Sequence, residues 1–195
     1  MLLAVSGSQG AGKTTVLNKL ANAGYKVIER KTSRSILSDW GVTLSQVNND
    51  HALTIKFQEE ILRRKVVDEI TAANSPDVWF TERTFTDLFV YALVALGKDN
   101  EYNDWLDDYY TKCTEAQHRM YGAVFYLHAG HFQPVHDGVR GTNRHYSKMV
   151  DLVMSHYTEL MTPSIKLCVI DTPDLDERVS IIENEITYIK TDKHL

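Results

Sequence analysis

Short apolar runs alternate along the chain with stretches in which apolar residues recur at helical spacing. The apolar runs predict five strands, at residues 2–6, 25–29, 77–81, 123–128 and 165–171. Most of these runs are rich in β-branched or aromatic residues and lack polar alternation, which is typical of strands covered on both faces. The helical spacing predicts a helix after residue 12 and further helices at residues 50–73, 85–96, 102–121, 148–160 and 175–189.

This alternation of strands and helices predicts an α/β fold, with helices on both faces of a five-stranded parallel sheet in three α/β/α layers. The chain contains no repeat, low-complexity run or linker, so we expect residues 1–195 to form one domain. Ligands of such folds bind beyond the carboxyl ends of the strands. Functional side chains are therefore expected at these strand ends.

Composition and charge limit the partners of the chain. The net charge of −5 argues against non-specific nucleic-acid binding through an overall positive field, although a local groove remains compatible with it. No run approaches the roughly 18 apolar residues of a membrane span, and the first strand is expected at residue 2, so we expect neither a membrane anchor nor a signal peptide. Cys113 and Cys168 lie in apolar surroundings and are expected to be reduced, as in a cytoplasmic protein.

Residues 7–14 match the phosphate-binding motif G-x-x-x-x-G-K-[ST] in full, between the first expected strand and the helix that follows it. Glycines let the backbone turn tightly around phosphate oxygens, while N–H groups and the helix N-terminus point at the anion. Lys13 is expected to reach the β- and γ-phosphates, and the Thr14 hydroxyl to bind Mg²⁺. The expected nucleotide-binding residues are Gly7, Ser8, Gln9, Gly10, Ala11, Gly12, Lys13, Thr14 and Thr15.

Charged residues follow the second and third expected strands. Glu29 ends the second strand, where it is a general base for a substrate hydroxyl, a group that holds the substrate, or a solvated charge. Glu82 follows the third strand in the Walker B arrangement, in which a carboxylate orients magnesium or its water, and Arg83 beside it is suited to clamp an anion. Asp87 begins the helix at 85–96, where it either reaches the cleft or stabilises the helix N-terminus.

The least regular segment lies at about 129–147. Glycines flank Val139 and Arg140, and Arg144 follows four residues after Arg140, a pattern that predicts a small mobile lid bringing positive charge to a triphosphate. The histidines here, among them His131 and His136, have no spacing typical of a zinc site, so contact with substrate or solvent is expected instead.

Together these residues resemble the P-loop nucleoside and nucleotide kinases, which include the deoxynucleoside kinases and the ribosylnicotinamide kinase-like proteins often found in phages. The likeness is carried by the motif at residues 7–15, Glu29, Glu82-Arg83-Thr84 with Asp87, Asp137-Gly138-Val139-Arg140, and Asp174-Leu-Asp-Glu-Arg178-Val. It implies a P-loop NTPase fold with a small lid. It also implies that Glu29 is the catalytic carboxylate and that Asp87 contacts the substrate.

The resemblance implies a kinase that uses ATP and Mg²⁺. In this scheme Glu82 holds magnesium with Thr14, partly through water, while Arg83 and the lid arginines neutralise charge on the transferred group. The expected acceptor is a nucleoside or a (deoxy)nucleoside monophosphate, which Asp87, His131 and His136 would contact; Arg34 would hold the phosphate of a monophosphate.

Two alternative functions and a second copy of the chain as a partner remain open. The first alternative is a kinase of a hydroxymethylated pyrimidine base within phage DNA, for which the basic run at residues 63–65 offers phosphate contacts. The second is a regulatory P-loop ATPase, although the chain has no N-K-x-D motif for guanine. The apolar helix at 85–97 is either core or a dimer interface, so a homodimer is also considered.

Overall fold

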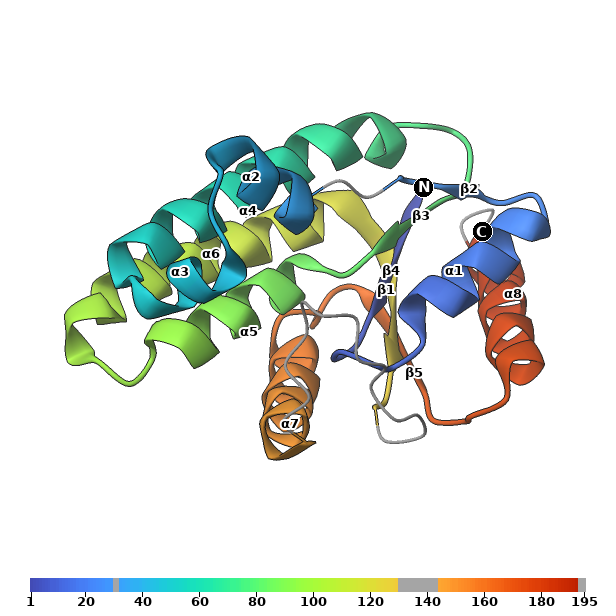
Figure 1. Cartoon of the computed structure of the whole chain (residues 1–195). Helices are drawn as coiled ribbons and strands as arrows, with labels where there is room; N and C mark the ends of the chain where they lie inside the picture. The colour runs from blue at the N-terminus through green and yellow to red at the C-terminus, as the bar shows by residue number, and fades with distance from the viewer. Residues whose placement is uncertain (30–31, 130–143, 193–195) are drawn as a thin grey trace.

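The computed structural model describes residues 1–29, 32–129 and 144–192, and in these parts the chain forms a parallel sheet between two layers of helices (Figure 1). The strands are β1 (Leu2–Ser6), β2 (Lys26–Val27), β3 (Trp79–Glu82), β4 (Tyr121–Leu127) and β5 (Lys166–Ile170). The α-helices are α1 (Lys13–Asn22), α2 (Thr32–Trp40), α3 (Leu44–Asn49), α4 (His51–Ala73), α5 (Phe85–Leu96), α6 (Asn103–Met120), α7 (Arg144–Leu160) and α8 (Leu175–Asp192). A 3₁₀ turn, η1 (Asn100–Tyr102), precedes α6.

The five strands lie in the order β2-β3-β1-β4-β5, and every neighbouring pair is parallel. This confirms the expected α/β class and the five-stranded parallel sheet. The central strand β1 is buried along its whole length, and successive residues face opposite layers. Leu2 and Ala4 pack against the core on the α4–α7 side, whereas Leu3 and Val5 pack against the core on the α1 and α8 side.

The edges of the sheet are shorter than the hydrophobic pattern predicts. β2 covers only Lys26–Val27 of the expected residues 25–29, because it lies at the sheet edge and pairs with β3 alone. Tyr25, just before it, places its ring edge-on to Phe80 at a centroid distance of 5.5 Å. Apolar residues at an edge can therefore pack without extending the hydrogen-bonded ladder.

Two helices were not predicted. Among the described side chains of α2, only Ile36 is completely buried, and α3 is six residues long, so neither helix carries a long apolar periodicity. The start of α3 is nevertheless encoded locally, because the Thr43 hydroxyl accepts from the Gln46 N–H and the Gln46 side chain accepts from the Thr43 N–H. Both helices lie over α4 (Figure 1). Both also contribute residues to a cavity that is described below.

The helix α5 belongs to the core of a single copy of the chain. Six of its apolar residues are buried within the described structure: Phe85, Leu88, Phe89, Val90, Ala92 and Leu96. The apolar character that suggested a dimer interface is therefore explained by packing within one chain, and the structure provides no support for a homodimer.

Three expectations from composition and segment boundaries can be compared with the structure. Cys113 and Cys168 are both free thiols. No helix among the described residues has a segment apolar enough to span a bilayer. Residues 144–147 of the expected lid form the first turn of α7. Residues 130–143 lie outside the described residues, so the lid stays a prediction.

Candidate active site

The P-loop connects the buried end of β1 to the first turn of α1. Gly7, Gly10 and Gly12 all have positive φ values, of 138°, 84° and 88°, which side chains rarely adopt. A Cβ atom on Gly7 would lie 2.4 Å from the Leu127 carbonyl oxygen, so the loop also needs glycine here for space. The sequence motif therefore corresponds to a backbone that only glycine permits.

Lys13 folds back over this loop. Its ammonium donates to the carbonyl oxygens of Gly7 and Ser8 at 2.8 and 2.9 Å, and its side chain is buried. The hydroxyl of Ser8 is buried and has no hydrogen-bond partner among the described residues. A cation and a buried donor at a glycine turn are the groups that a nucleotide phosphate requires, so the loop fits the expected ATP.

The end of β3 meets the P-loop as expected. Thr14, in the first turn of α1, donates its hydroxyl to the Glu82 carboxylate at 3.1 Å. A hydroxyl and a carboxylate side by side are hard oxygen ligands of the kind that Mg²⁺ prefers, so Thr14 and Glu82 are the pair that could hold this ion. They lie 68 residues apart in the sequence and are brought together by the pairing of β1 with β3.

Arg83 follows Glu82 in an unusual conformation. It is the only non-glycine residue with positive φ among the described residues, at 68°, and its N–H donates to the Val5 carbonyl at 2.8 Å. Its guanidinium lies over the Tyr91 ring, 5.0 Å from the centroid. Burial lowers the pKa of Arg83, but the neighbouring Tyr91 and Asp87 more than offset this, so the pKa ends above its ordinary value and the cation is retained.

Asp87 is fully buried at the N-terminus of α5 and does not line the cavity described below. One carboxylate oxygen accepts from the Ser6 hydroxyl at 2.6 Å and from the N–H and hydroxyl of Thr84 at 2.8 and 2.7 Å. Asp87 thereby completes a capping box with Thr84 and ties the end of β1 to α5. The expected helix N-terminal role is therefore observed, and contact of Asp87 with a substrate stays a prediction.

A cavity of about 660 Å³ opens beside Thr14, Glu82 and Arg83. Its apolar lining comes mainly from α3, α4 and α5, with Val47, Phe57, Ile61 and Leu88 among these residues. Gln9 and Arg34, both expected nucleotide or substrate residues, also line it. The phosphate-binding loop and a second compartment of mixed polar and apolar lining therefore share one cavity.

Sequence reasoning missed the polar group inside this compartment. Gln58 lies on the buried face of α4, and its side-chain oxygen Oε1 is buried with no hydrogen-bond partner among the described residues. The buried positions Thr54, Phe57, Gln58 and Ile61 recur at helical spacing, so a polar residue on the apolar face of this helix was the available signal.

A buried polar network supports Glu82 from behind. Lys65 forms an ion pair with Glu69 inside the protein, and Thr81 also donates to Glu69. The Lys65 ammonium lies 3.4 Å from the Glu82 carbonyl, and the Tyr121 hydroxyl donates to Glu69 at 2.7 Å. These contacts connect α4 to the backbone of β3 at the Walker B position.

Glu29 lies outside the large cavity. It is exposed and lines a much smaller hollow together with Lys65, Asp68 and Glu82. Its expected role as a base or a substrate-holding group therefore remains a prediction. The same is true of the lid: Arg140, His131 and His136 lie outside the described residues, and only the backbone of Arg144, the first residue of α7, is described.

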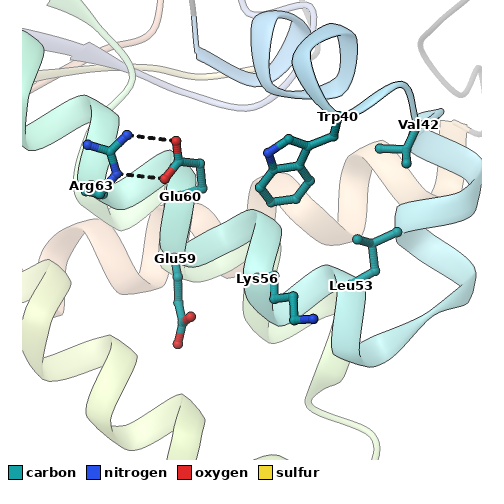
Figure 2. A pocket seen from close by; sticks show the side chains of 7 residues that line it. All are labelled: Trp40, Val42, Leu53, Lys56, Glu59, Glu60 and Arg63. Carbon is teal, nitrogen blue, oxygen red and sulfur yellow. Dashed lines mark hydrogen bonds and ion pairs between the residues drawn. The ribbon is translucent and has the colours of Figure 1, made fainter.

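The basic run at residues 63–65 is paired within the chain. Arg63 and Arg64 both donate to Glu60 at 2.7 Å, and Arg64 also contacts Asp39 at 2.8 Å. Figure 2 shows the pair between Arg63 and Glu60 beside Trp40, in a separate hollow of about 600 Å³ on α4. The cations proposed to contact DNA phosphates are thus already engaged by carboxylates, and the structure provides no support for a DNA acceptor.

The described residues contain no cluster of histidine, cysteine or carboxylate side chains that could hold a metal ion by themselves. A magnesium ion at Thr14 and Glu82 would therefore need further ligands from phosphate oxygens and water, which is the usual arrangement for Mg²⁺. The implied ion fits the site as part of a nucleotide complex.

A glycine-rich phosphate loop between a buried parallel strand and a helix, with a carboxylate at the end of the neighbouring strand, defines a P-loop protein. The chain belongs to the family described as the AAA domain, whose model matches residues 2–178. A comparison with curated protein sequences finds no match.

Solved structures with the same fold include deoxyadenosine kinase from M. mycoides with bound dATP. It is 16% identical, with a TM-score of 0.74 over 96% of this chain and 100% of that chain. The NadR protein in complex with NR is also 16% identical, with a TM-score of 0.66 over 88% of this chain and 45% of that chain. These comparisons confirm the expected P-loop kinase fold and the resemblance on which it was based.

Proposed function

We propose that the protein is an ATP- and Mg²⁺-dependent phosphotransferase that transfers the γ-phosphoryl group to a nucleoside or a (deoxy)nucleoside monophosphate. One observation carries this proposal: the P-loop and a cavity of about 660 Å³, lined by both apolar and polar side chains, meet at Thr14, Glu82 and Arg83. A protein that only hydrolyses ATP has no need of a second compartment at the γ-phosphate end. The fold shared with deoxyadenosine kinase and NadR supports the same activity.

The roles of the donor-site residues follow from their chemistry. The P-loop backbone and Lys13 would hold the β- and γ-phosphates, and Thr14 with Glu82 would hold magnesium, partly through water. When bound, the ion neutralises charge on the phosphate oxygens. Arg83 keeps its charge next to this site, and its Nε is buried without a hydrogen-bond partner among the described residues, so it is suited to an anionic group.

The compartment beyond the P-loop is suited to a nucleobase and its sugar. Phe57 and Ile61 supply apolar surface, and the unpaired Gln58 oxygen supplies an acceptor for an amino or imino group of a base. A buried amide oxygen without a partner is costly, so a ligand that satisfies it gains affinity. Arg34 at the same cavity would hold the phosphate of a monophosphate acceptor, and Glu29 and the lid arginines Arg140 and Arg144 remain proposed catalytic residues.

The test is an ADP-release assay with ATP, Mg²⁺ and a panel of nucleosides and monophosphates. Lys13→Ala is expected to abolish turnover with every acceptor. Gln58→Leu is expected to raise the acceptor KM roughly tenfold or more, because it removes one hydrogen bond to the base, while the ATP KM stays unchanged. Asn49→Leu, which replaces an exposed amide at the end of α3 that does not line the cavity, is the matched control.

Two results would contradict the proposal. Hydrolysis of ATP that no acceptor stimulates would favour a regulatory ATPase. Transfer only to duplex DNA containing hydroxymethylated pyrimidines, offered in parallel, would replace the small-molecule acceptor with a polymer.

A further inference from the structure

The motif at residues 174–179 has no role in the proposed reaction, yet it contains one of the largest fully buried side chains of the protein. Arg178 lies in the first turn of α8, and its side chain is only 1% exposed. Arginine is rarely buried without specific partners, because removing its charge from water is costly. The hydrogen-bond partners of Arg178 therefore indicate why an arginine is buried at this position.

Arg178 joins two segments that are far apart in the sequence. Its Nη1 donates to the carbonyl of Ala11, inside the P-loop, at 2.6 Å. Its Nε donates to the carbonyl of Thr172, in the connection between β5 and α8, at 2.5 Å. The contact is possible because α1 and α8 lie side by side on one face of the sheet (Figure 1).

The first of these contacts matters because of how a P-loop binds phosphate. Its N–H groups must point toward the anion, so its carbonyl groups point away and need donors elsewhere. Lys13 supplies the donor for Gly7 and Ser8, and the N–H of Val16 supplies it for Gly12. The Ala11 carbonyl instead accepts from Arg178, a residue that lies outside both the P-loop and α1.

The second contact gives the guanidinium a fixed anchor. The Thr172 hydroxyl donates to the Glu177 carboxylate at 2.6 Å and accepts from the Asp174 N–H at 3.3 Å. The Asp174 carboxylate in turn accepts from the Glu177 N–H at 2.9 Å. The β5–α8 connection is thus braced by its own hydrogen bonds at the residue that Arg178 holds.

The local charges agree with this arrangement. Burial lowers the pKa of Arg178, and the charge of Asp171 acts in the opposite direction. The two carbonyl contacts add charge-assisted hydrogen bonds that favour the cation. The guanidinium is therefore a positive group held directly behind the phosphate-binding loop.

We propose that Arg178 is a positioning residue, which holds the Ala11 carbonyl turned away from the phosphate site and couples the P-loop to the β5–α8 connection. This inference rests on the proposed function, because it concerns the affinity of the P-loop for the phosphates of ATP. It assigns no contact with the acceptor. Loss of Arg178 should therefore weaken ATP binding and leave the acceptor KM unchanged.

The test compares Arg178→Met and Arg178→Lys with Lys166→Met. Lys166 lies on β5 and pairs with Glu185 of α8 at 3.3 Å, so its loss weakens the same two elements without reaching the P-loop. The Kd of ATP with Mg²⁺ is measured by calorimetry, both KM values by ADP release, and folding by urea unfolding. From the usual contribution of a hydrogen bond to a charged group, Arg178→Met is expected to raise the ATP Kd about 10- to 100-fold. Arg178→Lys, which retains the charge but lacks the planar fork, is expected to fall between Arg178→Met and the wild type.

Every outcome bears on the inference. An ATP Kd for Arg178→Met within twofold of that for Lys166→Met would overturn it, as would an equal rise in the acceptor KM. If Arg178→Met does not fold, Arg178→Lys decides, and an ATP Kd equal to that of the control again overturns the inference. A wild-type protein that binds no ATP would refute the proposed function itself, whereas wild-type turnover with unaffected Arg178 variants would refute only the role of Arg178.

Discussion

Replacing Gly7 by alanine should damage the protein far more than replacing a glycine of similar backbone conformation elsewhere. Gly7 has a φ of +138°, and a Cβ atom there would lie 2.4 Å from the Leu127 carbonyl oxygen and 3.2 Å from the Ala11 Cβ. Gly24 has a φ of +96°, and a Cβ atom there would meet nothing within 4 Å. Gly24→Ala therefore measures the backbone cost alone.

The two contributions can be separated by magnitude. A side chain in a sparsely populated positive-φ region costs about 1–3 kcal/mol, a cost that both variants carry. The contact with Leu127 adds an overpacking cost of about 1–3 kcal/mol in Gly7→Ala, or more if nothing yields. Leu127 has little freedom to yield, because it is fully buried at the end of β4 and paired with Ile170 of β5.

Urea unfolding measured on both variants should therefore show Gly7→Ala to be less stable than Gly24→Ala by about 1–3 kcal/mol. ATP affinity provides the second readout, because displacement of Gly7 also moves the first carbonyl that Lys13 contacts. We expect a large loss of ATP binding in Gly7→Ala and none in Gly24→Ala. Equal free energies of unfolding in the two variants would show that the close approach to Leu127 does not constrain the loop, and the steric argument would be wrong.

Three further experiments test other parts of the structure. Lys65→Met leaves the carboxylate of Glu69 buried without its cation, so urea unfolding should show a loss of about 3–5 kcal/mol in the free energy of unfolding. The double variant Lys65→Met/Glu69→Leu should recover part of this loss. A double variant as unstable as the single one would contradict this reasoning. Burial raises the pKa of the thiols of Cys113 and Cys168, but Cys168 is only half-buried. A thiol reagent at pH 8 should therefore modify Cys168 in the folded protein and Cys113 only after unfolding. Fast labelling of Cys113 in the folded protein would be incompatible with its burial. Arg63 and Arg64 lower the pKa of Glu60 to about 2, below its unfolded value of about 4.3. The resulting stabilisation, up to about 1 kcal/mol, is present above pH 4.3 and is lost as pH falls toward 2. A difference in unfolding free energy between Glu60→Gln and the wild type that persists at pH 2 would refute this.

The phosphate site was predictable because its information is local. The positive φ values of Gly7, Gly10 and Gly12 are a property that almost only glycine supplies, so the residue types themselves indicate the turn. The same holds for Glu82, because a carboxylate directly after a buried parallel strand must lie at the carboxyl edge of the sheet. Its hydrogen bond to Thr14 follows from the pairing of β3 with β1.

The large cavity was not predictable in the same way, because much of its lining comes from helices whose packing no short pattern specifies. The unpaired amide of Gln58 is informative only once α2 and α3 are known to lie over α4 and enclose it. Asp87 illustrates the same limit. Its position at a helix N-terminus was correctly expected, but its hydrogen bond with Ser6, 81 residues away in the chain, depends on the packing of α5 against β1.

The sequence by itself determined the fold class and the position of the phosphate-binding loop, because apolar periodicity and glycine conformation act over a few neighbouring residues. Only the tertiary structure decided which distant side chains share a site. It placed Gln58 at the cavity, Asp87 against Ser6, and Arg178 against the Ala11 carbonyl, 167 residues away in the chain. The physical reason is that burial and hydrogen bonding between distant segments depend on how the helices pack on the sheet, and that packing minimises the free energy of the whole chain rather than of any one segment.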